Sequence, residues 1–530
     1  MNIDKKIIIL RDKACLTQED LAERLSVTRQ AVQKWESGAA APDINSLIAL
    51  SNYFNITIDG LVTDKPVDKT TEELRYSKRY LPNYAMIHHY ELYSANIMTE
   101  FRQMSDEGRG VSKYKKLAAE IAALPACKER EDMADRLFGL MSNEPVRGGY
   151  PYCEPDTLPE IKAYRKKTAF EFKKPVKDDK LLNKIKGAWL GRTAGCLLGH
   201  SIECIRSNDL NYLLKATGNY PLSRYILKSD LTGEIHEKCK YPLKGRDFAD
   251  TITYAPIDDD TNYTVMYAKK LISVYGRDFT PQDVAKCWLA NQPRDAYCTA
   301  ERVAFVNFVN GYYPPVSAVY KNPFREYIGA QIRGDYFGYI NPGNPETAAE
   351  MAWRDASVSH VKNGIYGEIF VAAMLACAAV CNDIKSVILC GLAEIPQKSR
   401  LYAEAMKLIK MYENGGSFND CTAMIFKKYD EHDWYDWTHT IPNALIVITA
   451  LLYGGMDFGK TICLAVGCGF DTDCNGATAG SILGMMLGAA KIPDKWTSVF
   501  KGKIETSICG VGAVSIDELC GLTMEHIPNE

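Results

Sequence analysis

Two short acidic runs are the residues of this chain whose types and spacing could do chemistry. Asp258, Asp259 and Asp260 are consecutive, and Asp471 and Asp473 flank one threonine far along the chain. A carboxylate at a helix N-terminus gains about 0.3–1 kcal/mol from the helix dipole, which would explain a single aspartate. Five carboxylates packed in a helical core are unfavourable unless a cation neutralises them, and Mg²⁺ and Mn²⁺ take carboxylate ligands. We therefore predict that the two runs meet in one divalent metal site.

Helices are predicted to position both runs. Val265 and Ile272 follow the first run at helical spacing, and Ile482 and Met486 follow the second. From about residue 181 to residue 525 the chain reads as one helix after another, joined by Gly, Pro and Asn. Alternating apolar and polar runs, which mark strands, are scarce there. The pattern predicts an all-α domain over 181–525.

Two further segments precede this domain. Residues 1–65 have the pattern of a compact helical bundle. Residues 66–180 are mixed, and we interpret them as a partly helical connector. It ends in the turn-rich stretch VRGGYPYCEPDTLPE, a composition typical of a boundary or an ordered connection.

Composition narrows the classes of protein that fit this chain. The 530 residues are 46% hydrophobic and 24% charged, as in globular proteins, and the net charge of −3 excludes a global attraction to nucleic acid or anionic lipid. The apolar stretch near the N-terminus is too short for a signal peptide, and no uncharged run reaches the roughly 20 residues of a membrane span. The 17 cysteines have no repeated spacing. We expect reduced thiols in a cytoplasmic protein that does not contact a membrane.

The N-terminal bundle resembles the phage-repressor type of helix-turn-helix domain. Thr17 is placed to cap one helix, with Asp20 at the capping-box position, and Thr28 is placed to cap the next. The resemblance implies a homodimer on double-stranded DNA. The residue types that hydrogen-bond base edges or phosphates are Gln18, Thr28, Arg29, Gln30, Gln33 and Lys34. The alternative is a helical dimerisation module, because residues 1–65 hold eight basic and nine acidic side chains.

The large domain resembles the ADP-ribosylglycohydrolase family, which includes the dinitrogenase-reductase-activating and ADP-ribosyl-arginine hydrolases. Four motifs occur in the family's order, and they are GAWLGRTAGCLLG at 187–199, DDDT at 258–261, DASVSH at 355–360 and DTD at 471–473. The first motif has glycines at four-residue spacing, which allows two helices to cross closely. The resemblance implies a compact all-α bundle that holds two Mg²⁺ or Mn²⁺ ions in a cleft.

The resemblance assigns roles position by position. It implies a metal site formed by Asp258, Asp259, Asp260, Asp471, Asp473 and Cys474. Glu203, Asp259 and Asp260 are the catalytic residues that it implies. This sequence departs from the family at Asp258, where the family has Thr or Ser, and at Cys474, where it often has a hydroxyl oxygen. Cys196 replaces a common acidic residue. Sulfur is a poor ligand for Mg²⁺.

Four further residues are weaker candidates for substrate binding. Asp355 and His360 belong to the third motif, although a histidine in such a helix is more often a buried, hydrogen-bonded residue. Tyr339 and Asn341 lie in a turn-rich stretch that would either cover the ligand or pack in the core. Two other charged residues in this region, Arg333 and Asp335, are expected to pair with each other.

Two functions follow from these features. The first is metal-dependent hydrolysis that removes ADP-ribose from a modified acceptor. The second is a transcriptional regulator whose large domain senses ADP-ribose or a related nucleotide with little catalysis. Hydrolysis of an unrelated glycoside on the same scaffold remains a third alternative, because a fold does not determine a substrate.

Overall fold

The chain divides into two helical units. The structure, a computed structural model, describes residues 3–63, 82–166, 172, 175–239 and 241–529. The units comprise Met1–Met86 and Ile87–Glu530. Within the described residues the strands are β1 (Lys503–Ile504) and β2 (Val514–Ser515), which pair antiparallel with Lys503 opposite Ser515. The predicted all-α fold is confirmed. The predicted connector, from Ile87 onward, lies in the second unit.

The first unit contains the helix-turn-helix. Thr17 accepts a hydrogen bond from the backbone of Asp20 and the Asp20 carboxylate accepts one from the backbone of Thr17, so the predicted capping box is present. Thr28 accepts a hydrogen bond from Ala31 N and caps the following helix. The core includes Ile7, Leu21, Val32, Trp35 and Leu50. The elements are α1 (Ile3–Lys13), α2 (Gln18–Arg24), α3 (Arg29–Glu36), α4 (Ile44–Phe54), α5 (Ile58–Val62) and η1 (Tyr84–Met86).

Residues 87–165 form a helical layer on the rest of the second unit. Arg325 is buried and donates hydrogen bonds to Glu100 and Glu107 of this layer at 2.7 Å each. Arg400 is paired in the same way with Glu154 at 2.9 Å. Buried ion pairs across this boundary make the layer an integral part of the unit. Its elements are η2 (Tyr93–Asn96), α7 (Ile97–Asp106), η3 (Val111–Tyr114), α8 (Lys115–Ala122), α9 (Lys128–Ser142) and α10 (Leu158–Tyr164).

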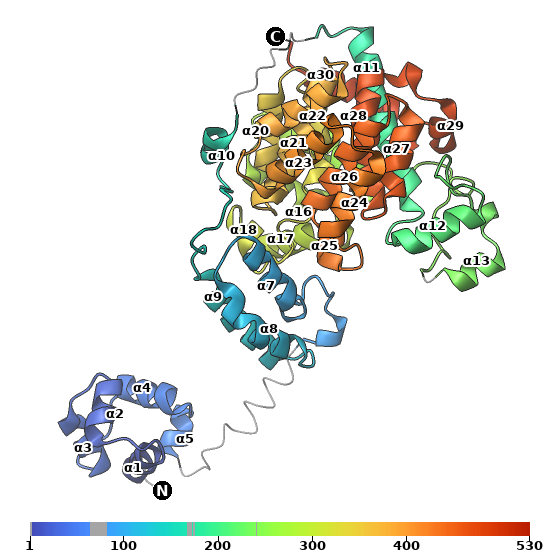
Figure 1. The fold of residues 1–530 in the computed structure, drawn as a ribbon. Helices are drawn as coiled ribbons and strands as arrows, with labels where there is room; N and C mark the ends of the chain where they lie inside the picture. The colour runs from blue at the N-terminus through green and yellow to red at the C-terminus, as the bar shows by residue number, and fades with distance from the viewer. Residues whose placement is uncertain (1–2, 64–81, 167–171, 173–174, 240, 530) are drawn as a thin grey trace. The chain divides into compact units, whose positions relative to one another are not determined.

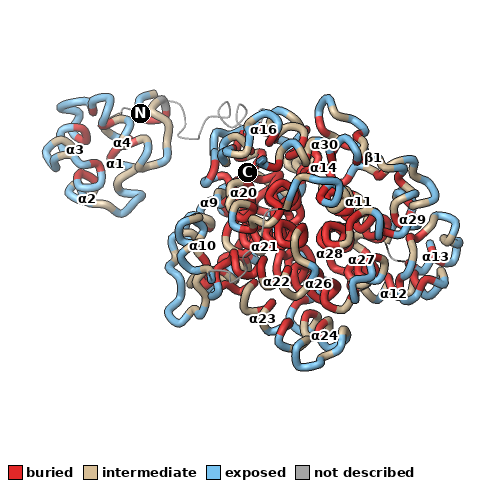
Figure 2. Tube along the Cα trace, turned by 90° about the horizontal axis from the view of Figure 1, so that it is seen from above, coloured by how far each residue is buried: buried red, intermediate tan, exposed pale blue. Residues whose placement is uncertain are grey.

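A central group of helices carries most of the buried surface of the second unit. Figure 2 shows the buried part of the chain running through α21, α26 and α28. Figure 1 shows α28 beside α11 and α27 in this group. Its members are α11 (Asp179–His200), α14 (Asp259–Met266) continued by η5 (Tyr267–Ile272), α21 (Lys362–Ala378), α22 (Ile384–Ala393), α26 (Thr440–Tyr453), α27 (Phe458–Gly467) and α28 (Thr472–Leu487).

The contact between α11 and α28 depends on glycine. The two helices run antiparallel, with Gly187 facing Gly484, Gly191 facing Gly480, and Gly195 facing Gly476. A Cβ atom at any of these positions would collide with the backbone of the facing helix. The close helix crossing predicted from the four-residue glycine spacing is therefore observed. At its far end Gly199 lies against Thr472 and Asp473, where the second acidic run begins α28.

A disulfide joins two helices of the central group. Cys377 on α21 and Cys390 on α22 form this bond, so the expectation that all cysteines are reduced is wrong for this pair. In the described part of the chain, no helix is both long and apolar enough to cross a membrane.

The other elements surround the central group. They are α12 (Ser207–Ala216), η4 (Lys228–Asp230), α13 (Gly233–Lys238), α15 (Ser273–Tyr275), α16 (Pro281–Asn291), η6 (Arg294–Ala296), α17 (Thr299–Val309), α18 (Val316–Val319), η7 (Gln331–Arg333), α19 (Asp335–Tyr339), α20 (Pro345–Ala356), α23 (Arg400–Glu413), α24 (Phe418–Lys428), α25 (Trp434–Thr438), η8 (Ala489–Lys491), α29 (Asp494–Thr497), η9 (Ser498–Phe500) and α30 (Ile516–His526).

Candidate metal centre

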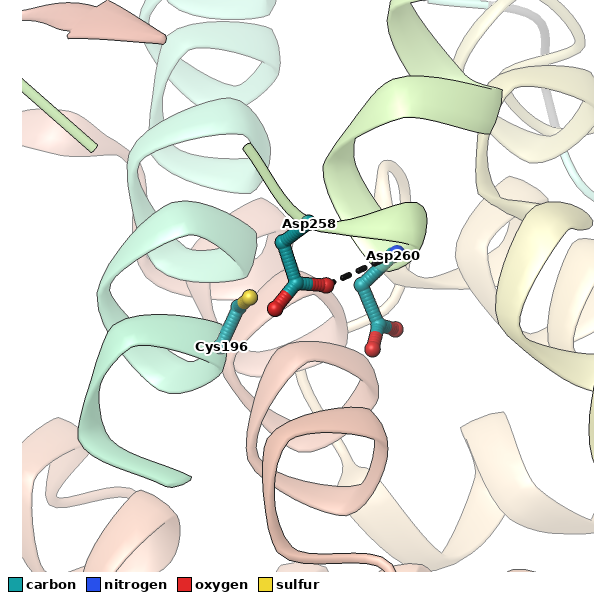
Figure 3. Close-up of side chains that lie close together, drawn as sticks. All are labelled: Cys196, Asp258 and Asp260. Atoms are coloured by element: carbon teal, nitrogen blue, oxygen red, sulfur yellow. Dashed lines mark hydrogen bonds between the residues drawn. The ribbon is translucent and has the colours of Figure 1, made fainter. Parts of the chain in front are cut away.

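Three helix ends bring the two acidic runs together. Asp258 caps the N-terminus of α14, Asp473 lies in the first turn of α28, and α11 ends beside both. The possible ligand atoms fall into three groups, each with all atoms within 4.8 Å of one another. Figure 3 shows Cys196 of α11 with its sulfur toward Asp258, and Asp260 beside them. The groups are Cys196, Asp258 and Asp260; His200, Asp258 and Asp473; and Asp260, Asp473 and Cys474.

Backbone contacts hold the helix ends in place. Ala255, just before the first run, is bridged to the β1 strand by hydrogen bonds of 3.0 and 2.9 Å. Before the second run, Phe470 has a φ of 55°, a left-handed conformation uncommon for a residue other than glycine. The turn is stabilised by Asp471 N, which donates to Asn443 Oδ1 at 3.2 Å, and by Thr472 Oγ1, which donates to Gly199 O at 3.0 Å.

Asp258 is a fully hydrogen-bonded member of the site. Its Oδ1 accepts from Asp260 N at 2.9 Å, and its Oδ2 lies 2.8 Å from His200 Nδ1. Burial alone would raise the pKa of Asp258, but the hydrogen bond and charge of His200 outweigh it and hold that pKa below its usual value. Burial likewise lowers the pKa of His200, and Asp258 more than compensates, so the pKa of the imidazole is raised. The two groups therefore favour an ion pair.

Asp260 and Asp473 are not satisfied by the protein. Oδ2 of Asp260 and Oδ1 of Asp473 are buried and have no hydrogen-bond partner among the described residues. Burial, and then the neighbouring carboxylates, raise the pKa of Asp473 well above its usual value. Burial also raises the pKa of Asp260, against the opposing charge of Arg192. Two unpartnered oxygens in a buried cluster of like charges fit a bound cation.

Arg192 lies on one side of this cluster. Its guanidinium donates to Asp260 O at 2.6 and 2.9 Å and to Asp260 Oδ1 at 3.0 Å. It also lies 3.0 Å from Asp335 Oδ2. Arg192 therefore occupies one carboxylate oxygen of Asp260 and leaves the other free. The expectation that Asp335 pairs with Arg333 is wrong, because Arg333 pairs instead with Asp355 and Glu301.

Three predicted residues lie around the cluster but outside the three groups of ligand atoms. Burial raises the pKa of Glu203 to about 7, and the charges of Asp471 and Asp258 contribute. Burial, then Asp258 and Asp260, raise the pKa of Asp259 well above its usual value. Asp259 stands between Asp258 and Asp260 in the chain, Asp471 stands two residues before Asp473, and Glu203 stands three residues after His200. Their roles as ligands or catalysts stay predictions.

The predicted substrate-binding residues lie in the core. Asp355 is fully buried, accepts a hydrogen bond from Tyr267 at 2.7 Å and pairs with Arg333. His360 is buried, with Nδ1 2.8 Å from Ser359 Oγ. His360 therefore has the buried, hydrogen-bonded environment that was its alternative in the sequence analysis, and Asp355 is buried as well.

The predicted turn-rich stretch is also packed. Tyr339 belongs to the buried helix α19, and its hydroxyl lies 2.6 Å from Ser481 Oγ on α28, so its ring is not available to stack on a base in this structure. Asn341 is buried and accepts a hydrogen bond from Arg277. None of these contacts brings Tyr339 or Asn341 to the three groups of ligand atoms.

Three residues near the cluster had no role in the sequence analysis. Arg192 lies within the glycine motif and His200 directly after it. The pattern that could have identified His200 is its position four residues, or about one helical turn, after Cys196. Tyr90 comes from the layer formed by 87–165. Burial is the main cause that raises the pKa of Tyr90, and the charges of Cys298, Cys204, Asp259 and Glu203 add to the effect.

The predicted DNA-binding face is exposed in the first unit. Gln18 is half-buried, and its amide donates to Glu36 at 2.7 Å rather than facing outward alone. The side chain of Thr28 is used as a cap. The remaining predicted residues are exposed on α3, and they are Arg29, Gln30, Gln33 and Lys34.

Two family models match the chain. The model described as ADP-ribosylglycohydrolase matches residues 177–522, and the model described as helix-turn-helix matches residues 7–61. The first match lies in the second unit and the second match in the first unit, and residues 62–176 lie outside both. The chain is therefore a fusion of a helix-turn-helix domain with an ADP-ribosylglycohydrolase domain.

Similar proteins match each part separately. The N-terminal part is 40% identical over 85 residues to the HTH-type transcriptional activator BcrR of Enterococcus faecalis, which is 16% of this chain and 42% of that protein. It is 32% identical over 72 residues to the HTH-type transcriptional regulator ImmR of Bacillus subtilis (strain 168), which is 14% of this chain and 57% of that protein. The chain thus spans about half the length of these relatives. A solved structure titled ADP-ribosylglycohydrolase-related protein complex aligns with 66% of this chain and 98% of its own, at 16% identity and a TM-score of 0.39.

Proposed function

The chain belongs to the ADP-ribosylglycohydrolase family, and we propose that it hydrolyses the glycosidic bond that joins ADP-ribose to a modified acceptor. The observation that carries this proposal is the pair of buried, unpartnered oxygens of Asp260 and Asp473 between converging helix ends. Such oxygens are costly to bury without a ligand. Family membership supports the reaction class, and the geometry supports a cation at this position.

The acidic residues would hold two divalent ions, Mg²⁺ or Mn²⁺. When bound, the ions would bind ribose hydroxyls and polarise a water molecule. Asp260 would contribute one oxygen, because Arg192 occupies the other. Asp258 would be oriented by His200. The full set of proposed ligands is Asp258, Asp259, Asp260, Asp471, Asp473 and Cys474.

Glu203 is the proposed acid or base. Its pKa of about 7 allows the carboxyl group to gain or lose a proton near neutral pH, as a general acid or base requires. Asp259 and Asp260 are the other proposed catalytic residues, and burial raises the pKa of both, which favours their protonated state. The proposed substrates are ADP-ribosylated acceptors, in which ADP-ribose is attached to an arginine, a serine or another residue.

Two isosteric variants test this proposal. Release of ADP-ribose from ADP-ribosylated protein is measured for the wild type, for Glu203→Gln and for Asp259→Asn. We expect both variants to lose activity by about 100-fold or more, since removing an acid or base costs about 10²–10⁴-fold. Glu237→Gln, an exposed carboxylate on α13, is the matched control and should remain active. Activity of Glu203→Gln and Asp259→Asn equal to the wild type would exclude the proposed roles.

We further propose that the protein binds double-stranded DNA as a homodimer in the cytoplasm and regulates transcription. The exposed polar face of α3 and the similarity to two HTH-type regulators support this. In this alternative the large domain senses ADP-ribose or a related nucleotide.

A mobility-shift assay with genomic fragments, including the protein's own promoter, tests DNA binding with and without ADP-ribose. The variants Arg29→Ala and Gln33→Ala should each lose about 1–3 kcal/mol of binding free energy if they contact bases. Lys13→Ala, an exposed cation at the end of α1, is the matched control. Equal loss in all three variants would indicate nonspecific attraction, and the absence of any shift would exclude the regulator. Light scattering of the same protein reports its oligomeric state.

A further inference from the structure

Each of the three groups of ligand atoms contains one donor that is not a carboxylate. Cys196 belongs to the first group, His200 to the second and Cys474 to the third, while the carboxylates of Asp258, Asp260 and Asp473 are shared between groups. Cys196 and Cys474 are 4% and 5% exposed, so both residues are buried. The donor set therefore combines sulfur, nitrogen and oxygen.

We infer that the metal centre of this chain is selective for a borderline transition-metal ion, represented by Zn²⁺, over Mg²⁺, through the thiols of Cys196 and Cys474. This inference rests on the metal centre of the proposed function, and it replaces the Mg²⁺ named there by another divalent ion. Thiolate and imidazole are ligands that suit Zn²⁺, whereas Mg²⁺ requires hard oxygen ligands and usually keeps several waters. A thiol that binds a metal is deprotonated outright.

The unpartnered oxygens supply an independent reason to place an ion beside the thiols. Asp260 Oδ2 and Asp473 Oδ1 are buried without a hydrogen-bond partner in the described structure, and both residues share a group with Cys474. The Asp260 carboxylate is also in the group that contains Cys196. Because Arg192 occupies Oδ1 of Asp260, this aspartate can give a metal one oxygen. A donor set that joins a thiolate to carboxylates suits the four-coordinate geometry of Zn²⁺, whereas Mg²⁺ takes oxygen ligands in octahedral geometry.

His200 is oriented by the same cluster. Its Nδ1 lies 2.8 Å from Asp258 Oδ2, and its Nε2 lies 3.7 Å from Asp247 on the exposed side. Because Nδ1 is paired with Asp258, His200 orients this carboxylate rather than binding the ion. The two thiols are therefore the donors on which the preference for Zn²⁺ depends.

A spectroscopic test separates sulfur ligation from mere proximity. The full-length chain is stripped with a chelator and reloaded with Co²⁺, which takes the place of Zn²⁺ and absorbs in the near ultraviolet by charge transfer when a thiolate is bound. We expect this band in the wild type, a weaker band in Cys196→Ser and Cys474→Ser, and none in the double variant. Cys287→Ser, a fully buried thiol outside the three groups, is the matched control and should keep the band.

Metal competition gives a second readout. The wild type, loaded with equal concentrations of Zn²⁺ and Mg²⁺, should retain Zn²⁺ on metal analysis. Loss of partners outside the first coordination sphere already costs 10–100-fold in metal affinity, so the double variant should bind Zn²⁺ at least about 10-fold more weakly, with Mg²⁺ affinity unchanged. A wild type without the charge-transfer band, or a double variant with unchanged Zn²⁺ preference, would overturn the inference. The wild-type spectrum decides the question even if the variants do not fold.

These readouts are independent of catalysis. A charge-transfer band without release of ADP-ribose would support sulfur ligation and contradict the proposed function. Release of ADP-ribose with Mg²⁺ and no band in the Co²⁺ form would contradict sulfur ligation and leave the proposed function intact.

Discussion

Carboxylates are buried at high density in two regions of the second unit, and the regions differ in what neutralises them. In the first region, Arg325 and Arg400 contact Glu100, Glu107 and Glu154 directly. The second region is the metal centre, where His200 neutralises Asp258 and Arg192 occupies one oxygen of Asp260. One oxygen each of Glu100, Asp260 and Asp473 has no hydrogen-bond partner in the described chain. Glu100 nevertheless faces Arg325, whereas the charged neighbours that act most strongly on Asp473 are carboxylates.

The comparison shows that burial of an acid does not by itself mark a functional site. A carboxylate matched by a guanidinium ties two layers together and becomes costly to unpair. A buried carboxylate without a cation beside it destabilises the protein until a metal ion binds, because no other group compensates for its lost hydration. The first kind supports the fold, and the second kind supports binding. The difference between them is open to experiment.

The largest effect is expected from Asp473→Asn at the metal centre. This change removes a negative charge from a crowded cluster, so the melting temperature in the presence of a chelator should stay the same or rise. Release of ADP-ribose should fall by about 100-fold or more, since loss of a residue outside the first coordination sphere costs 10–100-fold. A melting temperature in chelator that falls sharply would show that this cluster is structural, and the comparison would fail.

A large loss of stability is expected from Arg325→Met. The change leaves Glu100 and Glu107 buried without their cation, and breaking a buried pair costs about 3–5 kcal/mol. Denaturant unfolding followed by tryptophan fluorescence should show the loss. Stability equal to the wild type would mean that residues 87–165 do not depend on this ion pair.

A dependence of stability on pH is expected around Arg333, where Glu301, Asp355 and Glu368 surround one guanidinium. Burial raises the pKa of Glu301 from 4.5 to about 7, so the folded state holds this proton more tightly than the unfolded state. The stabilisation is complete below pH 4.5 and is lost as the pH rises through 7, which amounts to about 3 kcal/mol. Melting temperatures between pH 5 and 8 should fall in the wild type and fall less in Glu301→Gln. Parallel curves would contradict this origin.

The smallest effect is expected from Arg294→Met. Arg294 pairs with Glu91 and Asp295 at 3.3 and 3.1 Å, but its side chain is 49% exposed. Exposed ion pairs contribute about 0–1 kcal/mol. The free energy of unfolding, measured beside that of Arg325→Met, should change by no more than this. A loss as large as that of Arg325→Met would show that exposure does not separate the two kinds of pair.

Local patterns predicted the parts of the structure that depend on short spacing. The capping box of Thr17 and Asp20 and the glycine contacts of α11 follow from residues three or four positions apart. The meeting of the two acidic runs was predicted from charge, because like charges in a core require a shared cation. The resemblance to a known family added the order of the motifs.

The sequence could not predict pairs that depend on long-range packing. Arg192 contacts Asp260 across 68 positions and Arg325 contacts Glu100 across 225, and nothing near either arginine identifies the partner. Tyr339 was a candidate for an exposed loop because glycine, proline and asparagine surround it. It is buried because the short helix α19 packs against α21 and α28, a tertiary contact that local composition does not determine.

The glycines that face each other on α11 and α28 would permit more than one alignment of the two helices. If α28 slid by one turn, Gly191 would face Gly484, Gly195 would face Gly480 and Gly199 would face Gly476, so small residues would still oppose small residues. The repeat therefore sets the distance between the helices without choosing their alignment. The alignment is chosen at one end, where Thr472 bonds to Gly199 O. A shift of α28 by one turn would move Asp473 of α28 away from Cys196 of α11. An ion that binds both residues would therefore stabilise the observed alignment of the two helices.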